Sequence, residues 1–151
     1  MPDDKYCEVF VKDNTIYVFP NRELQPGARL VCQMVAKLDR AGSPDILGRA
    51  VLEALAAYRT DVPFPDDFQA ASIAALAGTG FKNWKAFSKQ AYRLGVSTDG
   101  ARVTVTPTVG DGRQNFADLP DKAITRPPNP DDVGKAILEA LSLCEWKSRI
   151  G

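Results

Sequence analysis

The sequence predicts an α/β (α+β) sandwich: a mixed, mostly antiparallel sheet with helices packed on it. Two observations predict this fold class. Runs of alternating apolar and polar residues, one near the start of the chain and one near residue 100, are typical of half-buried strands. Two apolar stripes of helical period, in residues 43–58 and 129–144, predict two helices that each bury one side against the sheet.

The first strands come at the start of the chain. In "YCEVFV", from Tyr6 to Val11, alternation places Tyr6, Glu8 and Phe10 on one face and Cys7, Val9 and Val11 on the other. Asp13 and Asn14 then predict a tight turn, because both tolerate the left-handed backbone that hairpin turns need. The run "IYVFP" is the returning strand, and "RLVCQMVAKL" over residues 29–38 is expected to form another strand.

The first long helix has a clear beginning at Ser43. Serine is a good N-cap, Pro44 suits the first helical position, and Asp45 favours the positive end of the helix dipole. The apolar residues that follow share one helix face: Leu47, Ala50, Val51, Ala54, Leu55 and Tyr58. Ala50 and Leu55 are therefore expected to be buried.

The middle of the chain predicts a loop and two further helices. Two prolines interrupt "RTDVPFPDDFQ", and Asp66 or Asp67 is a candidate cap for the helix "FQAASIAALAG". Residues 82–94 are expected to form a second helix that Gly95 ends, with Trp84 and Phe87 on one face. The opposite face of that helix carries four cations: Lys82, Lys85, Lys89 and Arg93.

The second half of the chain resembles the first. Asp99 and Gly100 predict a type I′ hairpin, "DKAITRP" predicts a short strand, and Asn129 caps a second long helix. The stretch "NPDDVGKAILEAL" repeats "SPDILGRAVLEAL" at an offset of 86 residues, with eight of thirteen positions identical. We interpret this as an internal ββ(β)α duplication. Because glycine weakens a helix, Gly48 and Gly134 indicate close backbone packing against a sheet or a partner helix.

Composition narrows the classes of function. The 151 residues predict a single domain, and 19 basic against 19 acidic side chains give no net field to hold a polyanion. Histidine is absent and the three cysteines are far apart, which disfavours an enzyme, a metal site or a cofactor site. The acidic start "MPDDKYCEVFV" does not resemble a signal peptide, and no apolar run is long enough to span a membrane, so we expect a cytoplasmic protein.

Two segments are candidate binding sites. The loop with Asp61, Phe64, Asp66, Asp67 and Phe68 presents aromatic rings beside carboxylates, which suits an interface with a basic protein. Its alternative is a solvated linker with both rings turned inward. The basic face of residues 82–93 suits phosphate groups, and its alternative is a surface helix that docks its aromatic side into the core.

Several stretches carry a resemblance to a known family. "FKNWKAFSKQAYRLGVSTDGARVTVTPT", then "GRQNFADLPDKAIT", then "PDDVGKAILEALSLCE", together with the earlier "SPDILGRAVLEALAAY", resemble the immunity proteins of bacterial contact-dependent growth inhibition. The loop "GDGRQNF" departs from that pattern, which has a richer glycine run. The resemblance implies a non-enzymatic protein that binds a cognate toxin domain, in many cases a nuclease, inside the producing cell.

From the resemblance and the chemistry together we form one hypothesis and keep one alternative. The hypothesis is an immunity protein whose acidic loop occupies the basic cleft of a nuclease toxin, with no direct contact to nucleic acid or membrane. The alternative is a small RNA-binding module or enzyme that uses the basic helix 82–93.

Overall fold

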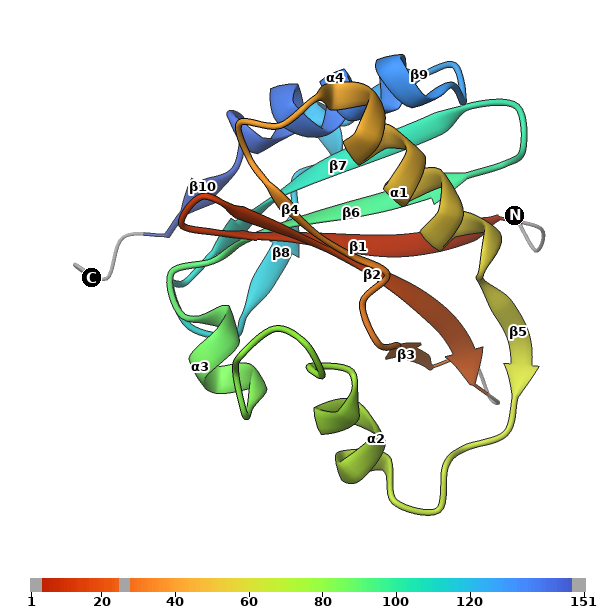
Figure 1. The fold of residues 1–151 in the computed structure, drawn as a ribbon, viewed down its shortest axis with the longest axis vertical. Coiled ribbons are helices and arrows are strands. Elements are labelled where there is room, and N and C mark those ends of the chain that lie inside the picture. Colours follow the sequence, from red (N-terminus) through yellow and green to blue (C-terminus); the bar gives the residue numbers. More distant parts are fainter. Residues whose placement is uncertain (1–3, 25–27, 148–151) are drawn as a thin grey trace.

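The computed structural model describes residues 4–24 and 28–147, and of Asp61 it describes the backbone only. Figure 1 shows a curled sheet with two long helices on one face and two short helices near the other. In chain order the elements of this part are β1 (Lys5–Lys12), β2 (Thr15–Leu24), β3 (Arg29–Val31), β4 (Ala36–Asp39), α1 (Pro44–Ala56), β5 (Arg59–Val62), α2 (Phe68–Ala74), α3 (Trp84–Ser88), β6 (Tyr92–Thr98), β7 (Val103–Gly110), β8 (Phe116–Asp118), a 3₁₀ turn (Pro120–Lys122), β9 (Ile124–Arg126), α4 (Pro130–Leu141) and β10 (Glu145–Trp146).

The sheet is mixed and mostly antiparallel, as predicted. Within the described residues it has ten strands, with the order β10-β7-β6-β1-β2-β3 along its main path. β4 and β5 also pair with β2, and β8 and β9 also pair with β7. Only β5 with β2 and β10 with β7 are parallel among the pairs in this part of the chain.

The two halves of the chain pair their strands in the same way. β2 is antiparallel to β1, β3 and β4 and parallel to β5, while β7 is antiparallel to β6, β8 and β9 and parallel to β10. In each half a long helix precedes the parallel strand, and β1 joins the halves by pairing with β6. This pattern matches the sequence repeat, although an origin by duplication stays a prediction.

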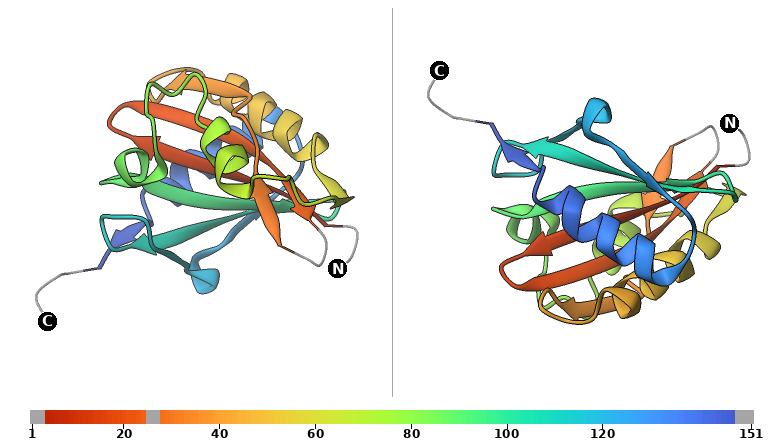
Figure 2. Two further views of the ribbon diagram at one scale, coloured as in Figure 1. Left: turned by 90° about the horizontal axis from the view of Figure 1, so that it is seen from below. Right: turned by 90° about the horizontal axis from the view of Figure 1, so that it is seen from above.

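The two long helices cross in direct backbone contact, which Figure 2 shows from above. A Cβ atom at Gly48 would lie 1.7 Å from the carbonyl oxygen of Pro130, and one at Gly134 would lie 1.7 Å from that of Pro44. Real Cβ atoms do not approach an oxygen so closely, so each helix needs glycine where it meets the first turn of the other. The predicted close packing is confirmed, and the partner is the other helix.

Local signals in the sequence correctly place most helix starts. The Asn129 side chain accepts from the Asp132 amide at 3.0 Å, and that of Asp67 accepts from the Ala70 amide at 2.9 Å. Ser43 occupies the N-cap of α1, but its hydroxyl donates to the Asp45 carboxylate and makes no cap hydrogen bond.

Two apolar clusters fill the two faces of the sheet. Between the sheet and the long helices, Ala50 and Leu55 are buried as predicted. The equivalent residues of α4, Ala136 and Leu141, are buried as well, together with Cys7, Val9 and Val11 of β1. The opposite face carries Phe10, Tyr17 and Phe19, which pack against Phe87 and Leu76 from the segment between the two halves. The alternation predicted for β1 is therefore confirmed.

Three sequence predictions are wrong in detail. Residues 29–38 form two short strands with a break at 32–35, because β3 and β4 pair with different parts of β2. The turn at Asp99 has four residues instead of two, since the Asp99 carboxylate accepts from the amides of Ala101 and Arg102. The helix expected over 82–94 ends at Ser88, because the chain from Tyr92 onward pairs with β1.

The glycine contact generates a stability prediction. Replacing Gly134 with Ala forces the two helices apart, and we expect the free energy of unfolding in urea to fall by about 3 kcal/mol. Gly95 in β6 is a matched control, because nothing lies within 4 Å of the Cβ that it would gain. Gly95→Ala is expected to change the stability by less than about 0.5 kcal/mol. Equal stability of Gly134→Ala and the wild type would contradict the proposed role of the crossing.

Candidate binding surface

The loop between β5 and α2 presents two aromatic rings to solvent. The side chains of Phe64 and Phe68 are 48% and 46% exposed, and their ring centroids lie 6.5 Å apart. The alternative with both rings turned inward is therefore wrong. An exposed pair of this kind is typical of a protein-binding surface, since interfaces concentrate aromatic anchors.

Acidic side chains flank this pair. Asp66 and Asp67 are both exposed, and Asp67 is held in place because its carboxylate caps α2. Asp61 lies in β5, but its side chain is outside the described part of the structure. Of the five predicted site residues, the structure thus brings Phe64, Asp66, Asp67 and Phe68 together at one loop, which we call the acidic-aromatic loop.

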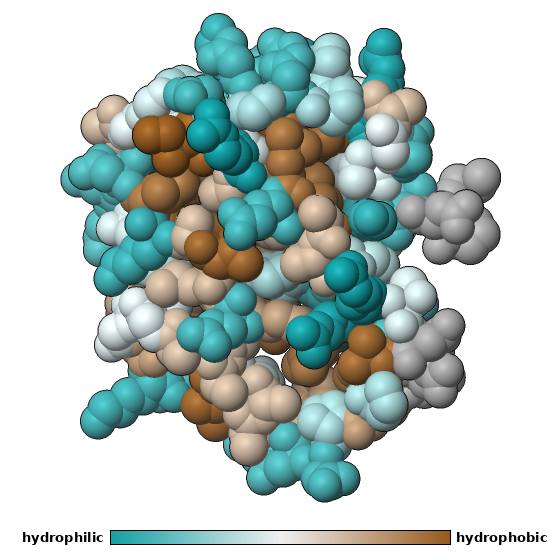
Figure 3. All heavy atoms as spheres, turned by 45° about the vertical axis from the view of Figure 1, so that its right-hand side comes forward, coloured by the Kyte–Doolittle hydropathy of each residue, from teal (hydrophilic) through white to brown (hydrophobic). Residues whose placement is uncertain are grey.

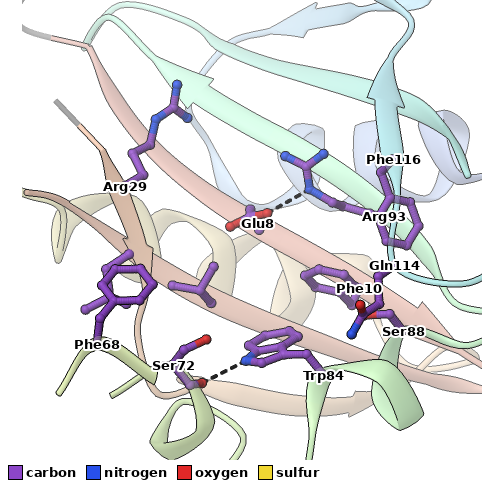
Figure 4. A pocket seen from close by; sticks show the side chains of 12 residues that line it. Glu8, Phe10, Arg29, Phe68, Ser72, Trp84, Ser88, Arg93, Gln114 and Phe116 are labelled. Carbon is purple, nitrogen blue, oxygen red and sulfur yellow. Dashed lines mark hydrogen bonds and ion pairs between the residues drawn. The ribbon is translucent and has the colours of Figure 1, made fainter. Parts of the chain in front are cut away.

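A pocket of about 340 Å³ lies beside this loop, between the sheet and the α2–α3 segment. Its apolar side is formed by Phe10, Trp84 and Phe116, while Phe68 belongs both to the pocket and to the acidic-aromatic loop (Figure 4). The lower half of the molecule is hollowed in Figure 3, with hydrophobic residues around the opening. The pocket and the loop therefore form one continuous candidate surface.

An ion pair crosses the floor of the pocket. Nε of Arg93 in β6 donates to the Glu8 carboxylate of β1 at 2.7 Å, and Asp118 lies 3.8 Å from the same guanidinium. The side chains of Glu8 and Arg93 are only 14% and 23% exposed, so this pair is shielded from bulk solvent. Sequence analysis missed the pair because 85 residues separate its members, although Glu8 shares the predicted face with Phe10.

Further contacts shape the pocket. Nε1 of Trp84 donates to the Ser72 carbonyl oxygen at 2.7 Å and thereby ties α3 to α2. At the rim, the guanidinium of Arg29 lies 3.9 Å from the ring centroid of Tyr6, which also packs edge-on against Tyr58. The Tyr58 hydroxyl donates to the Glu23 carboxylate at 2.8 Å, and burial together with this hydrogen bond raises the pKa of Tyr58 to about 12.

The predicted basic helix does not exist in the expected form. Lys82, Lys85 and Lys89 are exposed, but Arg93 lies in β6 and pairs with Glu8. Phe87 is fully buried, and Trp84 packs against the second apolar cluster. Phe87 is therefore part of the core, and Trp84 faces the pocket on the side of α3 away from Lys85 and Lys89, so the lysines and the aromatic rings do not share one surface.

Metal-ligating groups, membrane-spanning helices and cysteine reactivity bear on other classes of function. No group of three metal-ligating side chains occurs among them, and no helix in this part is both long and apolar enough to cross a membrane. Burial raises the pKa of the Cys7, Cys32 and Cys144 thiols, which disfavours a thiolate nucleophile. Fold and surface together describe a small α+β protein with exposed aromatic and charged side chains at a candidate binding surface.

Comparison with known proteins gives the family. The model of the contact-dependent growth inhibition (CDI) immunity proteins matches residues 32–144, and the chain belongs to this family. No curated protein matches the sequence.

Two solved structures share the fold at low sequence identity. A protein of unknown function from Neisseria meningitidis has a TM-score of 0.72 and 17% identity, with 94% of this chain and 96% of that chain covered. A chain from a CdiA-CT/CdiI toxin and immunity complex of Yersinia pseudotuberculosis has a TM-score of 0.71 and 15% identity, with 94% and 98% covered. Both similarities confirm the α+β fold.

Proposed function

We propose that the protein is the immunity partner of a CdiA-CT toxin domain, which it binds and neutralises in the cytoplasm of the cell that makes it. The family match and the fold shared with a chain of a toxin and immunity complex support a protein partner of this class. The observation that carries the proposal is the exposure of Phe64 and Phe68 beside an open pocket.

The mechanism that we propose is steric and electrostatic, without catalysis by the immunity protein. The two rings supply desolvated apolar contact, which dominates the energy of most interfaces. Asp66 and Asp67 stand in for the phosphates of a substrate and favour a basic cleft. A toxin that is a nuclease has such a cleft, and the acidic-aromatic loop then bars the nucleic acid from it.

Removing the rings tests the location of the interface. We expect Phe64→Ala with Phe68→Ala to weaken binding of the cognate toxin domain by at least about 100-fold, because each ring acts as an anchor. Isothermal titration calorimetry of the purified pair measures this change. A separate assay measures cleavage of nucleic acid by the toxin domain alone. It shows whether the toxin is a nuclease and whether an equimolar amount of wild-type protein stops the cleavage.

A matched control uses apolar residues of similar exposure elsewhere. Ile46 on α1 and Leu143 after α4 are 54% and 36% exposed, and their replacement by Ala is expected to leave the affinity within about threefold. If the control pair weakened binding as much as the Phe pair, the interface would lie elsewhere. If wild-type protein did not bind the toxin domain, the proposed function would be wrong.

The charge contribution is tested separately with Asp66→Asn and Asp67→Asn. Asparagine caps a helix as well as aspartate, so this double variant loses two charges while α2 stays capped. We expect the association rate at low salt to fall about tenfold with an unchanged melting temperature. Stopped-flow fluorescence measures the rate, and an unchanged rate would exclude a basic partner at this loop.

A further inference from the structure

A second charged feature lies on the other side of α3. Lys85, Lys89, Gly112 and Arg113 line a cavity of about 410 Å³, which we call the basic recess. All three cationic side chains are exposed. Among the described residues, none of these three side chains takes part in an ion pair, so their charges are available to a partner.

A backbone hydrogen bond joins the two walls of the basic recess: the Gln90 amide donates to the Gly112 carbonyl oxygen at 3.1 Å. The Lys12 ammonium of β1 donates to the Lys89 carbonyl oxygen and so ties the end of α3 to the sheet. Gln90 has a φ of 57°, a left-handed conformation that a residue other than glycine adopts only when its surroundings enforce it. The recess is therefore built before a partner arrives.

Asp111, two residues before Arg113, is hydrogen-bonded within its own loop. Its carboxylate accepts from the Asn115 side chain at 2.8 Å and from the Arg113 amide at 2.7 Å. These hydrogen bonds, that from Asn115 first, and to a smaller extent the charge of Arg113, lower the pKa of Asp111. Within the described residues the Arg113 guanidinium forms no salt bridge with Asp111, so the guanidinium can still contact a partner.

The basic recess and the pocket share one wall. In α3, Trp84 and Ser88 line the pocket, whereas Lys85 and Lys89, each one position further on, line the recess. In the β7–β8 loop, Gln114 lines the pocket and Arg113 the recess, and Figure 4 shows Trp84, Ser88 and Gln114 together on the pocket side. A protein that covers the mouth of the pocket therefore reaches the recess as well.

We propose that the basic recess binds carboxylate side chains of the same toxin domain and so fixes its orientation on the surface. This inference rests on the proposed function. The α2–α3 segment then carries opposite charge at its two ends, acidic at Asp66 and Asp67 and basic at the recess. Because the chain has no net charge, such local patches are its means of steering a partner into one orientation.

The chemistry of the recess favours a protein partner over a nucleic acid. Among the described residues, the side chains that line it include no aromatic ring for stacking on a base. The recess holds three cations and adjoins an apolar surface, as the polar rim of a protein interface does. Binding of nucleic acid is therefore an outcome that the experiment must distinguish.

The test compares two triple variants with the same loss of charge. The recess variant loses the three cations that line the recess: Lys85→Ala, Lys89→Ala and Arg113→Ala. The control variant loses three cations elsewhere on the surface: Arg49→Ala, Arg102→Ala and Lys135→Ala. The association rate with the cognate toxin domain is measured by stopped flow at about 0.02 M and about 0.5 M salt. A single-stranded RNA oligonucleotide is titrated in parallel.

We expect the recess variant to associate about tenfold more slowly at low salt and the difference to shrink at high salt, while the control stays within about twofold of wild type. Equal rates for both triple variants would overturn the inference and leave the proposed function intact. An unchanged toxin rate with loss of RNA binding in the recess variant would instead assign the recess to nucleic acid. A wild-type protein that binds no toxin would defeat both proposals.

Discussion

The structure depends on a contact between two helices that leaves no room for a side chain. Gly48 lies against the backbone of Pro130, and Gly134 lies against that of Pro44, so the first turn of each helix receives the glycine of the other. This reciprocal contact lets α1 and α4 share one face of the sheet, where both apolar stripes reach the same cluster. A side chain at either position forces the helices apart and loosens the packing beneath them.

The helix crossing lies on one face of the sheet, and the proposed binding surface lies on the other. The two halves of the chain, which pair their strands alike, supply the sheet and the long helices. The segment between them, residues 63–91, crosses to the opposite face, where Figure 2 shows α2 and α3 from below. The acidic-aromatic loop, one wall of the pocket and one wall of the basic recess come from this segment. If the proposed function holds, changes to this segment alter toxin binding with little effect on the helix crossing.

The sequence predicted what depends on neighbouring residues. Caps at Asp67 and Asn129, the apolar stripes and the alternation in β1 are local patterns, and all three hold in the structure. The repeat and the helical glycines together pointed to close packing, though not to which elements met. For the acidic-aromatic loop, the sequence left open whether the rings of Phe64 and Phe68 face solvent or turn inward. The tertiary structure shows that both rings are exposed.

Features made by distant segments were not predictable in the same way. The Glu8–Arg93 pair requires β1 and β6 to be adjacent, which no short pattern indicates. Residues 82–94 have helical spacing, yet seven-residue pairing with β1 begins at Tyr92 and outweighs the local preference. The basic recess could not be predicted from the sequence either, because its walls, α3 and the β7–β8 loop, are distant in the sequence.

Hydrogen–deuterium exchange of the protein alone and bound to its cognate toxin domain tests the central claim most directly, namely that one face is scaffold and the other binds the partner. The account predicts slower exchange on binding in residues 63–74, 84–89 and 111–116, with unchanged exchange in α1 and α4. Protection confined to the outer faces of α1 and α4, with no change in these three segments, would contradict it.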